Sequence, residues 1–307
     1  MTELIIDSHH HIWELRRIPW LQGPILPRIF GEYSSLKRDY LVEEFKRDLA
    51  PHGITGSVHV QANVGRGDEV AETAWLQGIA DVHGVPNGIV AYADLAAPDL
   101  AAVLDRHAVH ANLRGIRQQL HWHANPQYSF APRPDLMNDP AWRAGLAEVQ
   151  KRGLSFDLQV FPGQMADAAH LAQDFAGVRF VLLHAGMLQD RSAAGWAEWR
   201  IGMRALAACP NVWTKLSGLG TFVRACSVEL WRPVIEETLT LFGPARCMYG
   251  SNYPIESLWT TYARIFETTQ ECLAGLSSAE RRGVFHDNAA TFYRLSPDRF
   301  EHRKRGA

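Results

Sequence analysis

The fold of this chain is constrained most by a regular alternation of short apolar runs with segments of helical periodicity. Strands that alternate with helices are parallel, and eight such units in 307 residues favour a closed barrel over an open sheet. We therefore predict an α/β fold: a single (β/α)8 TIM-barrel domain over residues 1–307, with a frayed basic tail at 299–307. The eight predicted strands cover residues 4–9, 56–61, 87–93, 113–118, 155–160, 180–184, 212–216 and 246–250.

Local signals place some helix ends and two long loops. Asp39 is a candidate N-cap of a helix over 40–49, and Asp139-Pro140 starts a helix that runs to Lys151. Ser277 and Glu280 have the spacing of a capping box. The segments 14–37 and 121–138 read as long loops after the first and fourth strands, where a barrel builds its pocket. Glycine-rich phosphate-binding motifs do not occur in the sequence, which argues against a nucleotide-binding open sheet.

Composition narrows the class of protein. A net charge of −2 gives no indication of a nucleic-acid or anionic-membrane partner. The sequence has no apolar run of membrane-spanning length and no signal-peptide pattern, and its four cysteines are scattered. We expect a cytoplasmic protein with reduced thiols that acts on a small molecule. A homo-oligomer is left open.

The strongest functional signal is a run of histidines where the first predicted strand ends. Alternate residues of a strand share a face, so Asp7, His9 and His11 are expected to point the same way. Two imidazoles two residues apart can chelate one divalent ion or flank one substrate atom. The run reads Asp7-Ser8-His9-His10-His11-Ile12-Trp13.

Polar residues also stand at the ends of the other predicted strands, and in a parallel barrel these ends meet at one mouth. Arg117 suits a substrate carboxylate, with an ion pair to Asp157 as the alternative. Further candidates for this mouth are His59, Gln61, Gln159, His184, Lys215, Ser217 and Asn252.

Several segments resemble the amidohydrolase superfamily, specifically amidohydrolase family 2 and its lactonase-like branch. The histidine run looks like the family's Asp-x-His-x-His-x-Trp opening. Further similar segments are Val60-Gln61-Ala62, Gly115-Ile116-Arg117, Leu183-His184-Ala185-Gly186, Lys215-Leu216-Ser217-Gly218, Gly250-Ser251-Asn252-Tyr253-Pro254 and Asn288-Ala289. The resemblance covers essentially the whole chain and implies a metal-dependent hydrolase on a TIM barrel.

The resemblance implies that His9, His11 and His184 are catalytic and hold one divalent ion, zinc first among the candidates. A metal-free mechanism, in which these histidines polarise the substrate by hydrogen bonds, stays open beside it. The eighth strand departs from the family pattern, because Asn252 stands where an aspartate would serve as general base. Glu256, four residues on, is predicted to replace that base, with a solvated loop acid as the alternative.

The predicted substrate contacts rest on loop and strand-end positions. They are Gln61, Arg117, Trp122, His123, Lys215 and Tyr253, with His121 as a further loop candidate. A serine hydrolase is disfavoured because the sequence has no Gly-x-Ser-x-Gly motif.

Three functions remain in competition. The first is hydrolysis of a lactone, or a related cyclic ester, of a small acidic or sugar-acid molecule. The second is non-oxidative decarboxylation of an aromatic or muconate-like acid, which Asn252 argues against. The third is a non-catalytic binding barrel, which the retained histidines oppose.

Overall fold

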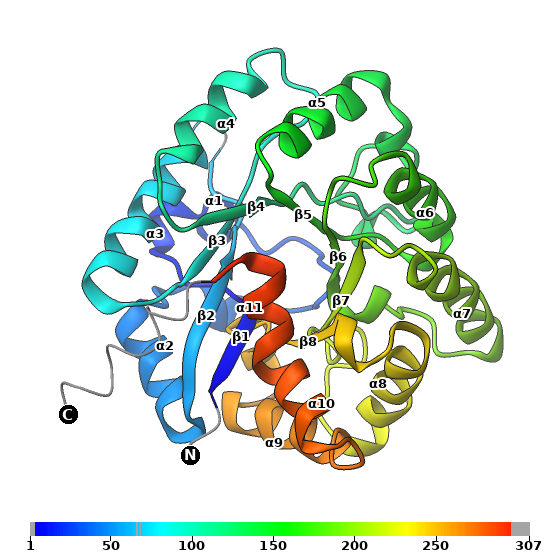
Figure 1. Cartoon of the computed structure of the whole chain (residues 1–307). Coiled ribbons are helices and arrows are strands. Elements are labelled where there is room, and N and C mark those ends of the chain that lie inside the picture. Colours follow the sequence, from blue (N-terminus) through cyan, green and yellow to red (C-terminus); the bar gives the residue numbers. More distant parts are fainter. Residues whose placement is uncertain (1–3, 66, 68, 296–307) are drawn as a thin grey trace.

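Eight parallel strands form one sheet in the order β1 to β8 in the computed structural model, as Figure 1 shows. The sheet curls into a barrel. The segment after β8 meets β1 through hydrogen bonds from Asn252 N to His9 O (2.7 Å) and from His11 N to Tyr253 O (2.8 Å). The strands are β1 Ile5–His10, β2 Ile54–Val60, β3 Gly88–Ala91, β4 Leu113–Ile116, β5 Ser155–Leu158, β6 Phe180–Leu182, β7 Val212–Leu216 and β8 Cys247–Tyr249. All eight predicted strands and the TIM-barrel fold are confirmed.

The structure describes residues 4–65, 67 and 69–295, and these form a single α/β domain. The predicted basic tail lies outside the described residues. Within them, no helix is both long enough and apolar enough to cross a membrane.

Helices surround the strands, and α11 lies across one end of the barrel (Figure 1). They are α1 Pro19–Gln22, α2 Val42–Leu49, α3 Glu69–His83, α4 Leu100–Ala108, α5 Pro140–Lys151, α6 Met165–Asp174, α7 Ala193–Ala207, α8 Val228–Phe242, α9 Tyr262–Cys272, α10 Ser278–Arg282 and α11 Asn288–Tyr293.

Two of the three predicted helix starts are confirmed. The Asp139 side chain accepts hydrogen bonds from Ala141 N and Trp142 N, and Ser277 and Glu280 form the capping box. The predicted Asp39 cap is wrong. Helix α2 begins at Val42, and the Asp39 carboxylate instead accepts a hydrogen bond from Leu15 N (2.7 Å), which fixes the start of the first long loop.

The core has two layers. The larger packs the outer faces of the strands against the helices. The smaller fills the barrel interior with apolar side chains from alternate strand positions, and the C-terminal residues Phe292, Tyr293 and Leu295 close it from the amino ends of the strands. The strand residues of this interior layer are Ile6, Val58, Val60, Val90, Val181 and Met248, and Leu183 joins them directly after β6.

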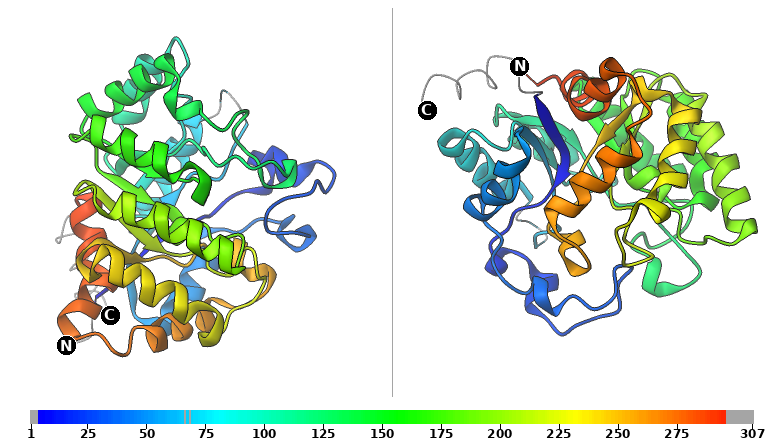
Figure 2. Two further views of the ribbon diagram at one scale, coloured as in Figure 1. Left: turned by 90° about the vertical axis from the view of Figure 1, so that its right-hand side faces the viewer. Right: turned by 90° about the horizontal axis from the view of Figure 1, so that it is seen from below.

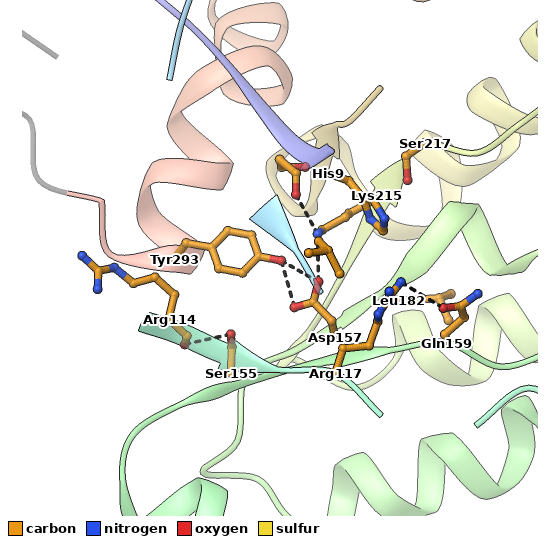
Figure 3. Close-up of polar contacts among 12 residues, drawn as sticks. His9, Arg114, Arg117, Ser155, Asp157, Gln159, Leu182, Lys215, Ser217 and Tyr293 are labelled. Atoms are coloured by element: carbon orange, nitrogen blue, oxygen red, sulfur yellow. Dashed lines mark hydrogen bonds and ion pairs between the residues drawn. The ribbon is translucent and has the colours of Figure 1, made fainter. Parts of the chain in front are cut away.

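One polar cluster interrupts this interior. Lys215 on β7 donates from Nζ to Asp157 Oδ2 on β5 (2.8 Å) and to the carbonyl of Ser8 on β1 (2.7 Å), as Figure 3 shows. The Tyr293 hydroxyl donates to Asp157 from α11 at 2.9 Å. Lys215 and Asp157 are fully buried, so the pair connects three strands and the C-terminal helix where water cannot replace it.

We expect Lys215→Met to destabilise the fold by about 3–5 kcal/mol, because it leaves the Asp157 charge buried without a counterion. The double variant Lys215→Met/Asp157→Asn removes that charge and should recover part of the loss. Urea unfolding of both variants measures the difference. Glu237→Gln is the control: it breaks the part-exposed pair with Arg200 and should change stability by less than about 1 kcal/mol. An equally small effect of Lys215→Met would contradict the assignment.

Candidate active site

His9 of β1 and His11 just after it point toward the barrel mouth because the strand contains a bulge, whereas His10 stacks on Phe45 of α2. Asp7 pairs with Ser57 and His10 with His59, so β1 has one residue more than β2 over this stretch. The expectation that Asp7 shares a face with His9 and His11 is wrong for this reason. The Asp7 carboxylate accepts hydrogen bonds from Ser251 and from the Tyr262 hydroxyl of α9. The Asp7 side chain therefore stabilises β1 and does not belong to the site.

His184 completes a cluster of three imidazoles. The ring of His9 lies 5.2 Å from the ring of His11 and 4.8 Å from that of His184, measured between centroids. Neighbouring residues of a strand point to opposite faces, and Leu183 points into the barrel. The strand alternation alone would therefore turn His184 away from the other two histidines. A left-handed backbone at His184 (φ 57°) turns its ring toward the other two. Gly218 makes room for it, since a Cβ there would lie 2.4 Å from His184 Nδ1.

Hydrogen bonds and burial set the protonation of these rings. His11 Nδ1 donates to the Val60 carbonyl (2.6 Å), which leaves Nε2 with a lone pair. His184 Nδ1 pairs with Ser217 Oγ at 2.9 Å. Burial lowers the pKa of His9 and His11 well below 6.5 and that of His184 to about 3. All three rings are neutral at pH 7.

These residues have the donor chemistry of a zinc site. Neutral imidazoles are preferred ligands of catalytic zinc, and both ring nitrogens of buried His9 lack a hydrogen-bond partner in the part of the chain that the structure describes. Among residues 4–65, 67 and 69–295, however, no group of three or more His, Cys, Asp or Glu side chains is arranged to hold a metal ion. The ligand types therefore fit a metal, while a coordination geometry is not formed.

A cavity of about 140 Å³ opens at this mouth. The two long loops line its outer part as predicted, and Gln127 Nε2 donates to the Arg28 carbonyl to connect them (3.1 Å). Figure 2 shows both loops on one side of the barrel. The polar and aromatic lining includes His11, Trp13, Trp20, Arg28, Phe30, Gln61, Asn63, Arg117, Gln119, His121, Gln127, Tyr128, Ser129, Phe130, Gln159, His184, Thr221, Phe222 and Asn252.

Arg117 is a buried cation in this cavity. Its guanidinium donates to Gln159 Oε1 (Figure 3) and to the Gln61 carbonyl, while Nε has no hydrogen-bond partner among the described residues. Burial lowers its pKa to about 10, which leaves it charged at pH 7. The alternative ion pair with Asp157 is not formed, since that carboxylate pairs with Lys215. No Asp or Glu is found among the described residues that line the cavity.

Asn252 lines the cavity, and Glu256 lies behind it. The Glu256 carboxyl is fully buried and accepts hydrogen bonds from Trp259 Nε1 (2.7 Å), Thr221 Oγ1 (3.4 Å) and Asn252 Nδ2 (3.5 Å). Burial raises its pKa to about 8, so it is mostly protonated at pH 7. The alternative of a solvated loop acid is wrong, and Glu256 itself is not among the residues that line the cavity.

Four predicted substrate contacts also lie outside the cavity lining. Lys215 is held in the barrel interior by Asp157, and Tyr253 packs on Tyr40 and Tyr262. Trp122 and His123 are not among the residues that line the cavity, and the His123 ring packs on Tyr128 and Phe161. The His59 ring is likewise outside and contacts the Ile12 carbonyl.

His121, the further loop candidate, does lie at the cavity. It lines the cavity and is buried, and its Nδ1 has no hydrogen-bond partner among the residues described. Arg117, Gln119 and His121 all face the cavity, so the period-two alternation continues past the end of β4. That alternation was the available signal for His121. The aromatic loop residues Trp20, Phe30 and Tyr128 carried no comparable pattern.

The fold and the site together define a TIM-barrel protein with an imidazole cluster at the carboxyl ends of its strands. The sequence profile of the amidohydrolase family matches residues 6–295. The chain therefore belongs to the amidohydrolase family.

Relatives and solved structures agree with this assignment. The uncharacterised protein y4mH of Sinorhizobium fredii is 40% identical, over 95% of this chain and 98% of its own length. An L-fucono-1,5-lactonase of Burkholderia multivorans is 31% identical, over 96% of this chain and 97% of its own length. The crystal structure of a Burkholderia multivorans amidohydrolase with bound zinc is similar at a TM-score of 0.80 and 30% identity, over 95% of this chain and 100% of that one.

We expect Glu256→Gln to change how stability depends on pH. The folded protein keeps the Glu256 proton up to about pH 8, whereas the unfolded chain loses it near 4.5, so this group lowers stability as pH rises between these values. The glutamine variant should therefore gain stability relative to the wild type, on the order of a few kcal/mol, from about pH 5 to about pH 8. Urea unfolding across this range measures it. Parallel curves for the two proteins would show that Glu256 is ionised in the fold.

Proposed function

We propose that this chain hydrolyses the cyclic ester bond of a lactone of a small acidic or sugar-acid molecule. The observation that carries the proposal is the meeting of His11, His184, Arg117 and Asn252 around one cavity that has no acidic lining residue among those described. The similarity to an L-fucono-1,5-lactonase supports the same reaction class. The amidohydrolase membership gives the broader class of hydrolase.

In the proposed reaction, water attacks the lactone carbonyl and its proton passes to His11. The Val60 carbonyl fixes the His11 tautomer, so Nε2 of the neutral ring carries a lone pair that can accept this proton. The low pKa of His11 makes its protonated form short-lived. The proton then passes from His11 to the ring oxygen as the C–O bond breaks, which gives a hydroxyl and a carboxylic acid. The acid ionises to the carboxylate by releasing its remaining proton to water.

The remaining groups act on the carbonyl and on the water. When the Ser217 hydroxyl donates to His184 Nδ1, His184 Nε2–H can donate to the developing oxyanion. Asn252 uses its Nδ2 toward Glu256, which leaves its amide oxygen to accept a hydrogen bond from the water. Glu256 thus orients Asn252 instead of taking the proton. When a divalent ion is bound, His9, His11 and His184 would hold it, and it would supply Lewis-acid polarisation of the carbonyl.

The two rival functions have weaker support. A 2,6-dihydroxybenzoate decarboxylase from Rhizobium is similar at a TM-score of 0.64 but only 14% identical, which is a likeness of fold alone. A binding barrel would not need the neutral, tautomer-fixed His11. Both rivals are outcomes of the test below.

We expect the wild type to open at least one member of a lactone panel, and His184→Ala to lower kcat/KM by about a hundredfold or more with the fold retained. The panel contains L-fucono-1,5-lactone, other sugar-acid lactones and lactones that carry a carboxylate. Initial rates are measured after chelation and after zinc addition. His170→Ala, an exposed position on α6, is the matched control. CO2 release without lactone opening supports the decarboxylase, and ligand-induced stabilisation without turnover supports the binding barrel.

Arg117→Met should weaken the hydrolysis of carboxylated lactones far more than that of neutral ones. Removing one member of a buried charged contact costs about 2–5 kcal/mol, which is at least about thirtyfold in kcat/KM. The comparison of a carboxylated lactone with its uncharged analogue measures this. Equal losses for both substrates would show that Arg117 supports the fold and does not bind a carboxylate.

A further inference from the structure

A second guanidinium, that of Arg28, faces the same cavity from the first long loop. Its Cζ lies 4.8 Å from the ring centre of Trp20 and 5.8 Å from that of Tyr33. The two aromatic rings hold the cation in place without neutralising its charge. Arg117 stands directly after β4 and Arg28 lies in a loop, so the two cations belong to the inner and outer parts of the cavity.

Arg28 has no partner for its charge in the described part of the chain. Its side chain makes no hydrogen bond or ion pair there, and its buried Nε is unsatisfied. Most other loop arginines are paired: Arg17 with Glu14, and Arg133 with Asp135 and Asp139. The unpaired guanidinium of Arg28 therefore differs from most of the other loop arginines.

The backbone around Arg28 is fixed before any ligand arrives. The Arg28 carbonyl accepts hydrogen bonds from Gln127 Nε2 (3.1 Å) and Gly31 N (3.0 Å). Gly31 has a φ of +82°, and a Cβ there would lie 2.6 Å from Arg224 Cζ, so the turn requires glycine. The Tyr33 hydroxyl accepts a hydrogen bond from Leu26 N at 3.0 Å, which holds the Tyr33 ring in place beside the Arg28 guanidinium. A preorganised cation loses little conformational entropy when it binds an anion.

We propose that Arg28 forms a second anion subsite at the outer part of the cavity, so that the preferred substrate carries two anionic groups. One is held by Arg117 and the other by Arg28. Four aromatic residues that line the cavity provide an apolar wall for the carbon skeleton between the two anionic groups. They are Trp20, Phe30, Tyr128 and Phe222. This inference rests on the proposed function for the identity of the reaction, but anion binding can be measured without turnover.

Binding of unreactive acids tests the subsite. Isothermal titration calorimetry compares butyrate, which has one carboxylate, with succinate, glutarate and adipate, which have two at increasing separation. The wild type should bind the best dicarboxylate about tenfold more tightly than butyrate, which corresponds to about 1.4 kcal/mol. Arg28→Gln should abolish this preference and leave butyrate binding unchanged. 3-Phosphonopropionate, compared with succinate, tells whether the second group is a carboxylate or a phosphate-like anion.

Arg17→Gln is the matched control, because Arg17 lies in the same loop and over an aromatic ring (Trp75) but does not line the cavity. It should keep the preference for two carboxylates. Equal binding of butyrate and all dicarboxylates by the wild type would overturn the subsite. A preference that survives Arg28→Gln, or that Arg17→Gln also removes, would overturn it as well. Dicarboxylate binding that depends on Arg28, together with no lactone turnover, would support the subsite and reject the proposed function.

Discussion

The buried ion pair of Lys215 and Asp157 determines much of what the site can do. It connects β1, β5 and β7 to the C-terminal helix inside an otherwise apolar barrel. Asp157 makes its ion pair with Lys215, and its negative charge also opposes the effect of burial on the pKa of Arg117. Arg117 therefore remains charged at the cavity, and the Lys215 charge helps to lower the pKa of His9. A structural contact in the barrel interior thus sets the electrostatics of its mouth.

Features that follow from periodicity could be predicted from the sequence. The eight strands were recognisable because buried parallel strands are short apolar runs between helical segments. The placement of His11, His184 and Arg117 at one cavity followed from the rule that strand ends meet at the mouth of a barrel. The two long loops that line this cavity were recognisable as segments that have neither the helical nor the strand periodicity of apolar residues.

Features that depend on single backbone departures could not be predicted. The bulge in β1 reverses the expected direction of Asp7, and the left-handed turn at His184 brings its ring inward against the strand alternation. The burial of Glu256 depends on Thr221, which is distant in sequence, and on how the ring of Trp259 folds back from the end of the short turn that contains Glu256. Trp122 and His123 lie in a loop whose path is set by contacts that have no period.

The hydrogen bond between Gln127 and the Arg28 carbonyl has a consequence for how such proteins diversify. The groups proposed to react stand just after the ends of barrel strands, whereas the outer cation and its aromatic neighbours belong to two loops that this hydrogen bond joins. Substitutions in one loop are constrained by the other loop, and also by contacts with the barrel such as the hydrogen bond from Trp20 Nε1 to the Ala62 carbonyl (3.0 Å). Relatives can therefore keep the same chemistry while the paired loops exchange one class of substrate for another.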